Sequence, residues 1–163
     1  MVKKVMCNEA FFGAGCFWHV ELSFSKILGV VETEVGYMGG DEESDKVTYK
    51  EVCTDTTGHA EVTRVVYDPK KITYKKLLEN FWKMHDPTQV NRQGPDIGSQ
   101  YRSVIFYTDE SQKKAATQLK AELQKKLGKK KAATEIVKAG KFYKAEDYHQ
   151  KYLEKRGLNA CPF

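Results

Sequence analysis

The feature that most constrains the fold is a regular alternation of strand-like and helix-like hydrophobic patterns. Residues 10–13 form a short apolar run typical of a buried strand. Apolar side chains then recur at helical spacing over residues 17–28, and Gly29 follows as a typical helix end. Residues 31–37 and 60–67 alternate apolar and polar side chains, which is the period of a half-buried strand. The first half of the chain therefore predicts the order β-α-β-β.

The second half continues the same alternation. The patterns predict a helix at 73–85, a strand at 101–107, a helix at 109–127, a strand at 134–138 and a helix at 145–156. The first six elements then have the βαββαβ order of ferredoxin-like folds, followed by a further αβα unit. We expect an α/β (α+β) two-layer sandwich.

One long segment lacks this patterning. Residues 86–100 have almost no apolar content, so we expect a structureless loop there. Loops of that length inside a compact domain are usually functional. With 163 residues and neither an internal repeat nor a linker, the chain predicts a single domain over residues 1–163, with flexible ends at 1–8 and 157–163.

Composition excludes several classes of protein. Hydrophobic residues at 40% and charged residues at 30% are typical of a globular domain rather than a disordered one. The apolar run at residues 10–18 is about half the length that a membrane span needs, and no targeting segment is visible. Four scattered cysteines are too few for a disulfide scaffold. We therefore expect a cytoplasmic protein whose cysteines are catalytic, metal-binding or inert.

Cys16 stands where the first strand passes into the first helix. Gly13 and Gly15 let the backbone turn sharply before it. At a helix start, unpaired backbone N–H groups and the helix dipole favour a thiolate, and lower a cysteine pKa from about 8.5 towards neutrality. Phe17 fits the apolar face of the helix, but Trp18 lies off it. Two interpretations stay open here: a nucleophile in an aromatic pocket, or a buried structural cysteine.

The motif around Cys16 is one of several blocks in a recognisable order. Its Gly-Cys-Phe-Trp sequence, followed by Glu21, resembles the signature of the A-type peptide methionine sulfoxide reductases. Further matching blocks occur in the family's order at residues 36–40, 49–53, 57–61, 98–103 and 145–150. The resemblance covers roughly residues 9–161. His19 departs from it, since the family usually has glycine there, and we expect His19 to alter the rim of the pocket.

The resemblance implies thiol-dependent reduction of the S epimer of methionine sulfoxide, free or in proteins, to methionine. It implies that the Cys16 thiolate attacks the sulfoxide sulfur and that Glu61 supplies a proton to the oxygen. A carboxyl group in an aromatic pocket has a raised pKa and can be protonated near neutral pH. Without the resemblance, Glu61 would be interpreted as an exposed glutamate at the start of a strand.

The resemblance also implies roles for five further side chains. Tyr49 and Tyr101 match phenols that donate hydrogen bonds to the sulfoxide oxygen. Asp96 matches an acid that orders the site, partly through water. Phe17 and Trp18 would bind substrate by forming a slot for its methyl group.

Attack by Cys16 leaves a sulfenic acid that must be reduced. Cys161 follows the last predicted helix, near the end of the chain, as a resolving cysteine requires. The resulting disulfide would pass to a thioredoxin-like reductant. Cys53 is the alternative resolver, although its block favours a packed position, and Cys7 has no assigned role. Many family members carry two cysteines near the end where this chain has one.

Other chemistries have weaker support. No C-x-x-C pair, phosphate-binding glycine loop or dinucleotide motif is present, so we expect neither a metal nor a cofactor. His59 and His149 lie in matched blocks, and we interpret them as supporting or packing residues. The lysine-rich run 125–131 offers a competing hypothesis of nucleic-acid binding, but a solvated helix end is the simpler interpretation. The expected protein is a monomer with no nucleic-acid or membrane partner.

Overall fold

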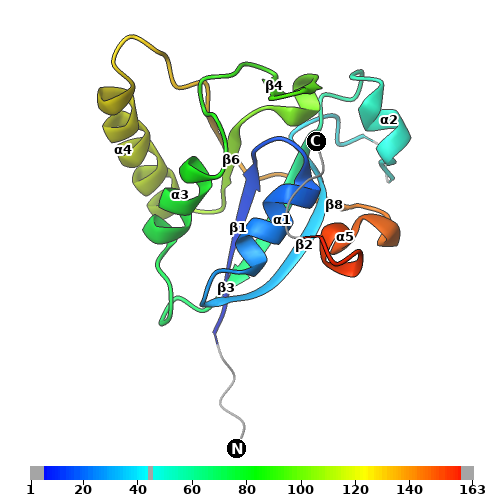
Figure 1. The fold of residues 1–163 in the computed structure, drawn as a ribbon, viewed down its shortest axis with the longest axis horizontal. Helices are drawn as coiled ribbons and strands as arrows, with labels where there is room; N and C mark the ends of the chain where they lie inside the picture. Colours follow the sequence, from blue (N-terminus) through cyan, green and yellow to red (C-terminus); the bar gives the residue numbers. More distant parts are fainter. Residues whose placement is uncertain (1–5, 44–45, 159–163) are drawn as a thin grey trace, which may run out of the picture.

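The computed structural model describes residues 6–43 and 46–158. Their centre is a six-stranded sheet in the order β7-β6-β1-β3-β2-β8 (Figure 1). Only β6 and β7 pair in parallel. The strands are β1 (Asn8–Gly13), β2 (Val30–Met38), β3 (Ala60–Tyr67), β6 (Val104–Tyr107), β7 (Glu135–Lys138) and β8 (Tyr143–Lys144). β3 lies between β1 and β2, and β6 on the other side of β1, which confirms the ferredoxin-like core.

Helices cover one face of the sheet. α1 packs against β2 and β3, and α4 packs on α3 beside β6 and β7 (Figure 1). The helices are α1 (Phe17–Ser25), α2 (Tyr49–Cys53), α3 (Tyr74–Lys83), α4 (Glu110–Leu127) and α5 (Tyr152–Lys155). α3 begins after Thr73, whose hydroxyl accepts the Lys76 N–H at 3.1 Å as an N-cap.

Between the sheet and these helices lies the larger hydrophobic cluster, here called the helix-side core. Phe12 is at its centre and stacks on Phe24 of α1 and Phe81 of α3, with ring centroids 4.9 and 5.1 Å apart. Its buried members are Ala10, Phe12, Ala14, Val20, Phe24, Val65, Tyr67, Ile72, Leu77, Leu78, Phe81, Ile105, Ala116 and Leu119. Burial of this much apolar surface is the main stabilising contribution to the fold.

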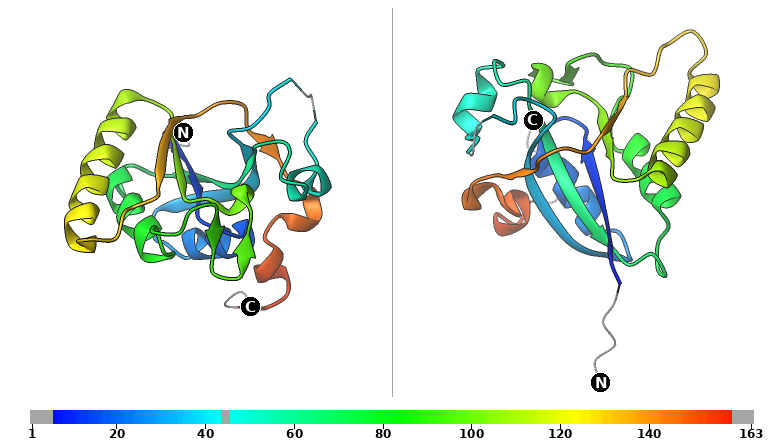
Figure 2. Two further views of the ribbon diagram at one scale, coloured as in Figure 1. Left: turned by 90° about the horizontal axis from the view of Figure 1, so that it is seen from above. Right: turned by 180° about the vertical axis from the view of Figure 1, so that it is seen from behind.

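The opposite face of the sheet is covered without a long helix. Phe11 of β1 packs on Phe142, with ring centroids 5.5 Å apart, and Ala139 also packs against this cluster. The segment between β7 and β8 thus crosses behind the sheet (Figure 2). Side chains alternate along β3, so Val62 faces this segment whereas Glu61 faces α1.

The segment predicted to be a structureless loop has short regular elements, so that prediction was wrong. β4 (Arg92–Gln93) and β5 (Asp96–Ile97) form a hairpin, and the 3₁₀ turn η1 (Ser99–Tyr101) follows. The Gly98 N–H donates to the carbonyl of Asn91 and closes the hairpin. Polar side chains on a small, exposed hairpin leave no hydrophobic periodicity to detect.

The last predicted helix is also wrong, because residues 145–156 are broken into two short pieces. They form η2 (Asp147–His149) and α5, separated by Lys151 in the left-handed region at φ 52°. The Lys151 N–H donates to the buried Glu21 carboxylate at 2.6 Å, and the Gln150 amide pairs with the backbone of Val35. These long-range bonds replace the hydrogen bonds of a continuous helix.

α1 is shorter than its pattern predicts. It ends at Ser25, and Leu28 is 87% exposed, so that residue does not continue the buried face. The strand β8 had no counterpart in the sequence patterns, since two residues carry too little periodicity.

Candidate functional site

Cys16 lies at the N-cap position of α1, three residues after the last residue of β1. Its side chain is partly exposed and caps no backbone N–H. Gly15 precedes it at φ +91°, and a Cβ there would lie 2.8 Å from Cβ of Gln93. Both the backbone angle and the close approach of the β4–β5 hairpin therefore require glycine. The thiol sits at the positive end of the helix dipole, as the sequence predicts.

Glu61, on β3, lies beneath the start of α1. It is 1% exposed, and its Oε1 accepts the Phe17 N–H at 3.3 Å. Burial raises the pKa of Glu61 to about 8, against the opposing effects of the Phe17 N–H and the Tyr101 phenol. The side chain is therefore largely protonated at neutral pH. It is not an exposed glutamate at a strand start, so that alternative interpretation is wrong.

Two phenols accompany this carboxyl group. Burial raises the pKa of Tyr101, and nearby Glu61, Asp96, Cys53 and Cys16 raise it further. The Tyr101 phenol is thus close to both the thiol and the carboxyl group. Burial likewise raises the pKa of Tyr49, as does a hydrogen bond to Cys53. Both phenols stay neutral at pH 7 and can donate a hydrogen bond.

Asp96 and Cys53 border the same region. Asp96 is on β5, half-buried, and burial raises its pKa. Cys53, at the end of α2, is exposed, so the prediction of a packed position was wrong. Partial burial of its sulfur nevertheless raises its pKa, against the hydrogen bond from Tyr49.

The aromatic residues after Cys16 differ in exposure. Phe17 is 1% exposed and packs on Tyr37 and His149, with ring centroids 5.7 and 5.2 Å away. Trp18 is half-buried, and its indole stacks on Tyr152 at 3.7 Å and 6°. We call the polar and aromatic group at this end of α1 the site cluster: the buried Phe17, Tyr37, Glu61 and His149, with the partly buried Tyr49.

Sequence patterns assigned no specific contact to His149, Glu146 or Tyr152. The Trp18 Nε1–H donates to His149 Nδ1 at 3.0 Å, and the Tyr49 N–H donates to Glu146 Oε1 at 3.2 Å. The only available signal was the block at residues 145–150, which does not show what its side chains contact. His19, one turn after Cys16, has a buried Nδ1 with no hydrogen-bond partner among the described residues.

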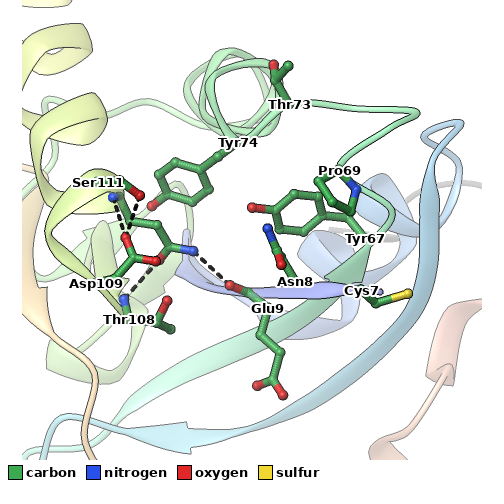
Figure 3. Close-up of a pocket in the computed structure, with 11 residues that line it drawn as sticks. Cys7, Asn8, Glu9, Tyr67, Pro69, Thr73, Tyr74, Thr108, Asp109 and Ser111 are labelled. Carbon is green, nitrogen blue, oxygen red and sulfur yellow. Dashed lines mark hydrogen bonds between the residues drawn. The ribbon is translucent and has the colours of Figure 1, made fainter. Parts of the chain in front are cut away.

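A cavity of about 590 Å³ lies at the opposite end of β1 (Figure 3). Asn8, Tyr67 and Tyr74 line it, together with Asp109 at the start of α4. Cys7 is exposed at its edge. None of the predicted site residues that the structure describes lines this cavity, so it is separate from the predicted site around Cys16.

Three further predictions concern a resolving cysteine, metal binding and membrane spans. Cys161 lies outside the described residues. Among the described residues, no group of three or more His, Cys, Asp or Glu side chains is arranged to hold a metal ion. In residues 6–43 and 46–158, no helix is long and apolar enough to cross a membrane.

Comparisons with known proteins agree with one another. A family model described as "Peptide methionine sulfoxide reductase" matches residues 8–163. "Peptide methionine sulfoxide reductase MsrA" of Methanosarcina acetivorans is 58% identical over 152 residues, covering 93% of this chain and 80% of that protein. The crystal structure of Mxr1 from Saccharomyces cerevisiae in reduced form superimposes with a TM-score of 0.89 at 42% identity, over 96% of this chain and 90% of that one. Mxr1 in complex with Trx2 gives a TM-score of 0.63 at 29% identity, over 96% and 86% of the two chains.

Proposed function

Because this chain belongs to the peptide methionine sulfoxide reductase family, an oxidoreductase family that reduces methionine sulfoxide, we propose that it reduces the S epimer with Cys16 as nucleophile. The S epimer follows from the A-type motif, since each epimer has its own enzyme. The observation that carries the proposal is the buried Glu61 carboxyl group beneath the helix start that holds Cys16.

In the first step, the Cys16 thiolate attacks the sulfoxide sulfur. The sulfur–oxygen bond breaks, and the oxygen ends on the Cys16 sulfur as a sulfenic acid while methionine leaves. The sulfoxide oxygen gains negative charge during attack, and Glu61 supplies the proton that neutralises it. A carboxyl group with a pKa of about 8 is protonated at neutral pH and can act in this way.

Two neutral phenols stabilise the same negative charge on the oxygen. Tyr49 and Tyr101 donate hydrogen bonds to the oxygen, which they can do because their pKa values are raised. Asp96 orders this region, partly through water. The indole of Trp18 forms the wall of the methyl slot, and the buried Phe17 ring forms its floor.

Recycling requires a second thiol and an external reductant. The Cys161 thiol attacks the sulfenic acid, forms a disulfide with Cys16 and releases water. A thioredoxin-like dithiol then reduces the disulfide. The complex of yeast Mxr1 with Trx2 supports this donor class. We further propose a single-domain, cytoplasmic monomer that needs no metal or cofactor.

The decisive experiment is mass mapping of disulfides after one equivalent of methionine-S-sulfoxide. We expect a Cys16–Cys161 disulfide in the wild-type protein. Cys16→Ser should abolish reduction with dithiothreitol, and Cys161→Ser should keep one turnover but lose thioredoxin-driven cycling. Cys7→Ser, at the opposite end of β1, is the matched control and should behave as wild type.

Each outcome has a separate meaning. Activity in Cys16→Ser would refute the assignment of the nucleophile. A Cys16–Cys53 disulfide would replace Cys161 by Cys53 as the resolver. Reduction of the R epimer in preference to the S epimer would refute the proposed stereochemistry.

A further inference from the structure

His149 is a buried imidazole that contacts three side chains of the proposed site. It is 1% exposed, and its ring lies 4.5 Å from the Tyr49 ring and 5.2 Å from the Phe17 ring, centroid to centroid. Its Nδ1 accepts the Trp18 indole N–H at 3.0 Å. No step of the proposed reaction uses this group, although it contacts both the wall and the floor of the methyl slot.

The hydrogen bond to Trp18 determines the tautomer. An indole N–H can only donate, so Nδ1 of His149 must present a lone pair, and the proton of the neutral ring is on Nε2. Nε2 faces Glu146 Oε2 at 3.6 Å. That distance is too long for a good hydrogen bond, and Nε2 has no hydrogen-bond partner among the described residues.

Among the described residues, the hydrogen bond to His149 is the directional contact that opposes in-plane rotation of the Trp18 ring. The stack on Tyr152, at 3.7 Å and 6°, holds the plane of the indole but permits sliding and rotation within it. Arg156 lies 3.7 Å from the Tyr152 centroid, so it occupies the other face of that ring and keeps the stack in place. A directional N–H···N bond supplies the constraint that stacking lacks.

We propose that His149 is a positioning residue, whose neutral imidazole holds the Trp18 indole in the orientation that shapes the methyl slot. The inference rests on the proposed function, because it takes Trp18 to be a wall of that slot. In this proposal His149 acts through the Trp18 indole and not on the substrate or the Cys16 sulfur.

Charged and titratable neighbours favour the neutral ring. Burial lowers the pKa of His149, and Glu146 opposes this effect. Glu146 itself accepts hydrogen bonds from the Tyr49 N–H and from the Tyr148 and Tyr37 hydroxyls. The phenols of Tyr37, Tyr49 and Tyr148 are neutral, since their pKa values are raised. Protonation of Nδ1 would set two N–H donors against each other and break the bond to Trp18.

The test uses Trp18 fluorescence in a Trp82→Phe background. The chain has two tryptophans, so emission then reports Trp18 alone. Trp82 lies away from the site, where its indole N–H donates to the Thr134 hydroxyl beside the helix-side core. In this background, Trp18 emission should change as acid protonates His149, below the ordinary histidine pKa of about 6.5. His149→Leu should shift the emission and abolish its pH dependence below 6.5.

Kinetics give the second readout. His149→Leu should raise KM for methionine-S-sulfoxide about tenfold or more, with a smaller effect on the maximal single-turnover rate, because a methyl slot contributes mainly to binding. His149→Asn places an amide oxygen near the position of Nδ1, and it should recover much of the KM and the emission while lacking the acid titration. If His149 served only in packing, the Asn variant would not recover KM and emission better than the Leu variant.

Three results would overturn the proposal. Wild-type KM in His149→Leu would do so, as would Trp18 emission that is insensitive to pH between 4 and 7 in the Trp82→Phe protein. Equal defects in His149→Asn and His149→Leu would reduce His149 to packing. If His149→Leu does not fold, the acid titration and the Asn variant still decide. Failure of the proposed function is separate, because it appears as activity in Cys16→Ser while the emission titration persists.

Discussion

The two ends of α1 lie in different kinds of interior. Val20 and Phe24 enter the helix-side core, whose buried members are almost all hydrocarbon side chains. Phe17 enters the site cluster, where a carboxyl group, an imidazole and the Tyr37 phenol are buried with it, and the Tyr49 phenol is partly buried. One nine-residue helix therefore joins a region that stabilises the fold to the region that we propose carries the chemistry.

The difference shows where stability is gained and where it is lost. Apolar burial around Phe12 and Phe81 lowers the free energy of the folded state. Burial of Glu61 raises the free energy of the folded state at any pH where that carboxyl group is ionised, because a buried charge loses its hydration. Substitutions in the helix-side core should therefore lower mainly stability, whereas substitutions in the site cluster should lower mainly the reaction rate.

Phe81→Ala should have the largest effect, and on stability alone. Phe81 is fully buried and stacks on Phe12, so its loss should lower the free energy of unfolding by about 3–5 kcal/mol in urea denaturation. The half-buried Phe142, on the other face of the sheet, is the control and should cost less as Phe142→Ala. A rate loss in fully folded Phe81→Ala as large as that of a site variant would break the comparison.

Glu61→Gln should act on rate, by about a hundredfold in single turnover with methionine-S-sulfoxide. The wild-type rate should fall as pH rises through about 8, where Glu61 loses its proton, and this alkaline limb should vanish in the variant. Glu9→Gln, which removes a surface ion pair with Arg64, is the control. A loss of less than threefold in Glu61→Gln would reject the proton-donor role.

The same Glu61→Gln substitution should also remove a pH dependence of stability. The unfolded carboxyl group loses its proton near pH 4.5, but the folded one keeps it until about 8. Wild-type stability should therefore fall relative to Glu61→Gln as pH rises from about 4.5 to about 8, by on the order of 2–4 kcal/mol. The same difference in free energy of unfolding between the two proteins at pH 5 and at pH 9 would contradict this.

The smallest effects should come from a matched pair of helix caps. Thr73 caps α3, which carries Phe81, and Thr48 caps α2, which carries Tyr49; each hydroxyl accepts an N–H three residues later. Thr73→Ala should cost about 1 kcal/mol of stability and leave the rate unchanged. Thr48→Ala should lower the rate through Tyr49 with little change in global unfolding, because α2 has only one buried residue. A rate loss in Thr73→Ala together with a stability loss in Thr48→Ala would refute this assignment of stability and rate to the two regions.

The sequence predicted the parts of the fold that local periodicity controls. Phe12, Phe24 and Phe81 lie in a strand and two helices whose apolar spacing is regular, and those elements are present. The chain from Ala145 to Arg156 has a helix-like pattern too, but the carboxylate of Glu21 binds the backbone at Lys151 and a left-handed residue ends the run. Such a contact, 130 residues apart, leaves no trace in local pattern.

The candidate site divides in the same way. The position of Cys16 at a helix start was predictable from two glycines and the apolar helix that follows. The burial of Glu61 was implied by the family resemblance but not by the local pattern, because it depends on β3 lying beside β2 and under α1. The exposure of Cys53 was missed since a five-residue helix on the surface has no period to detect.

α1 also determines which partner must move in the proposed bond between Cys16 and a second sulfur. The helix is about 13 Å long and rigid over that length. Val20 and Phe24 are held in close-packed surroundings that resist displacements of even a methyl group. Cys16 is thus held in a fixed position, and in the proposed cycle the substrate and any second thiol must move to reach it.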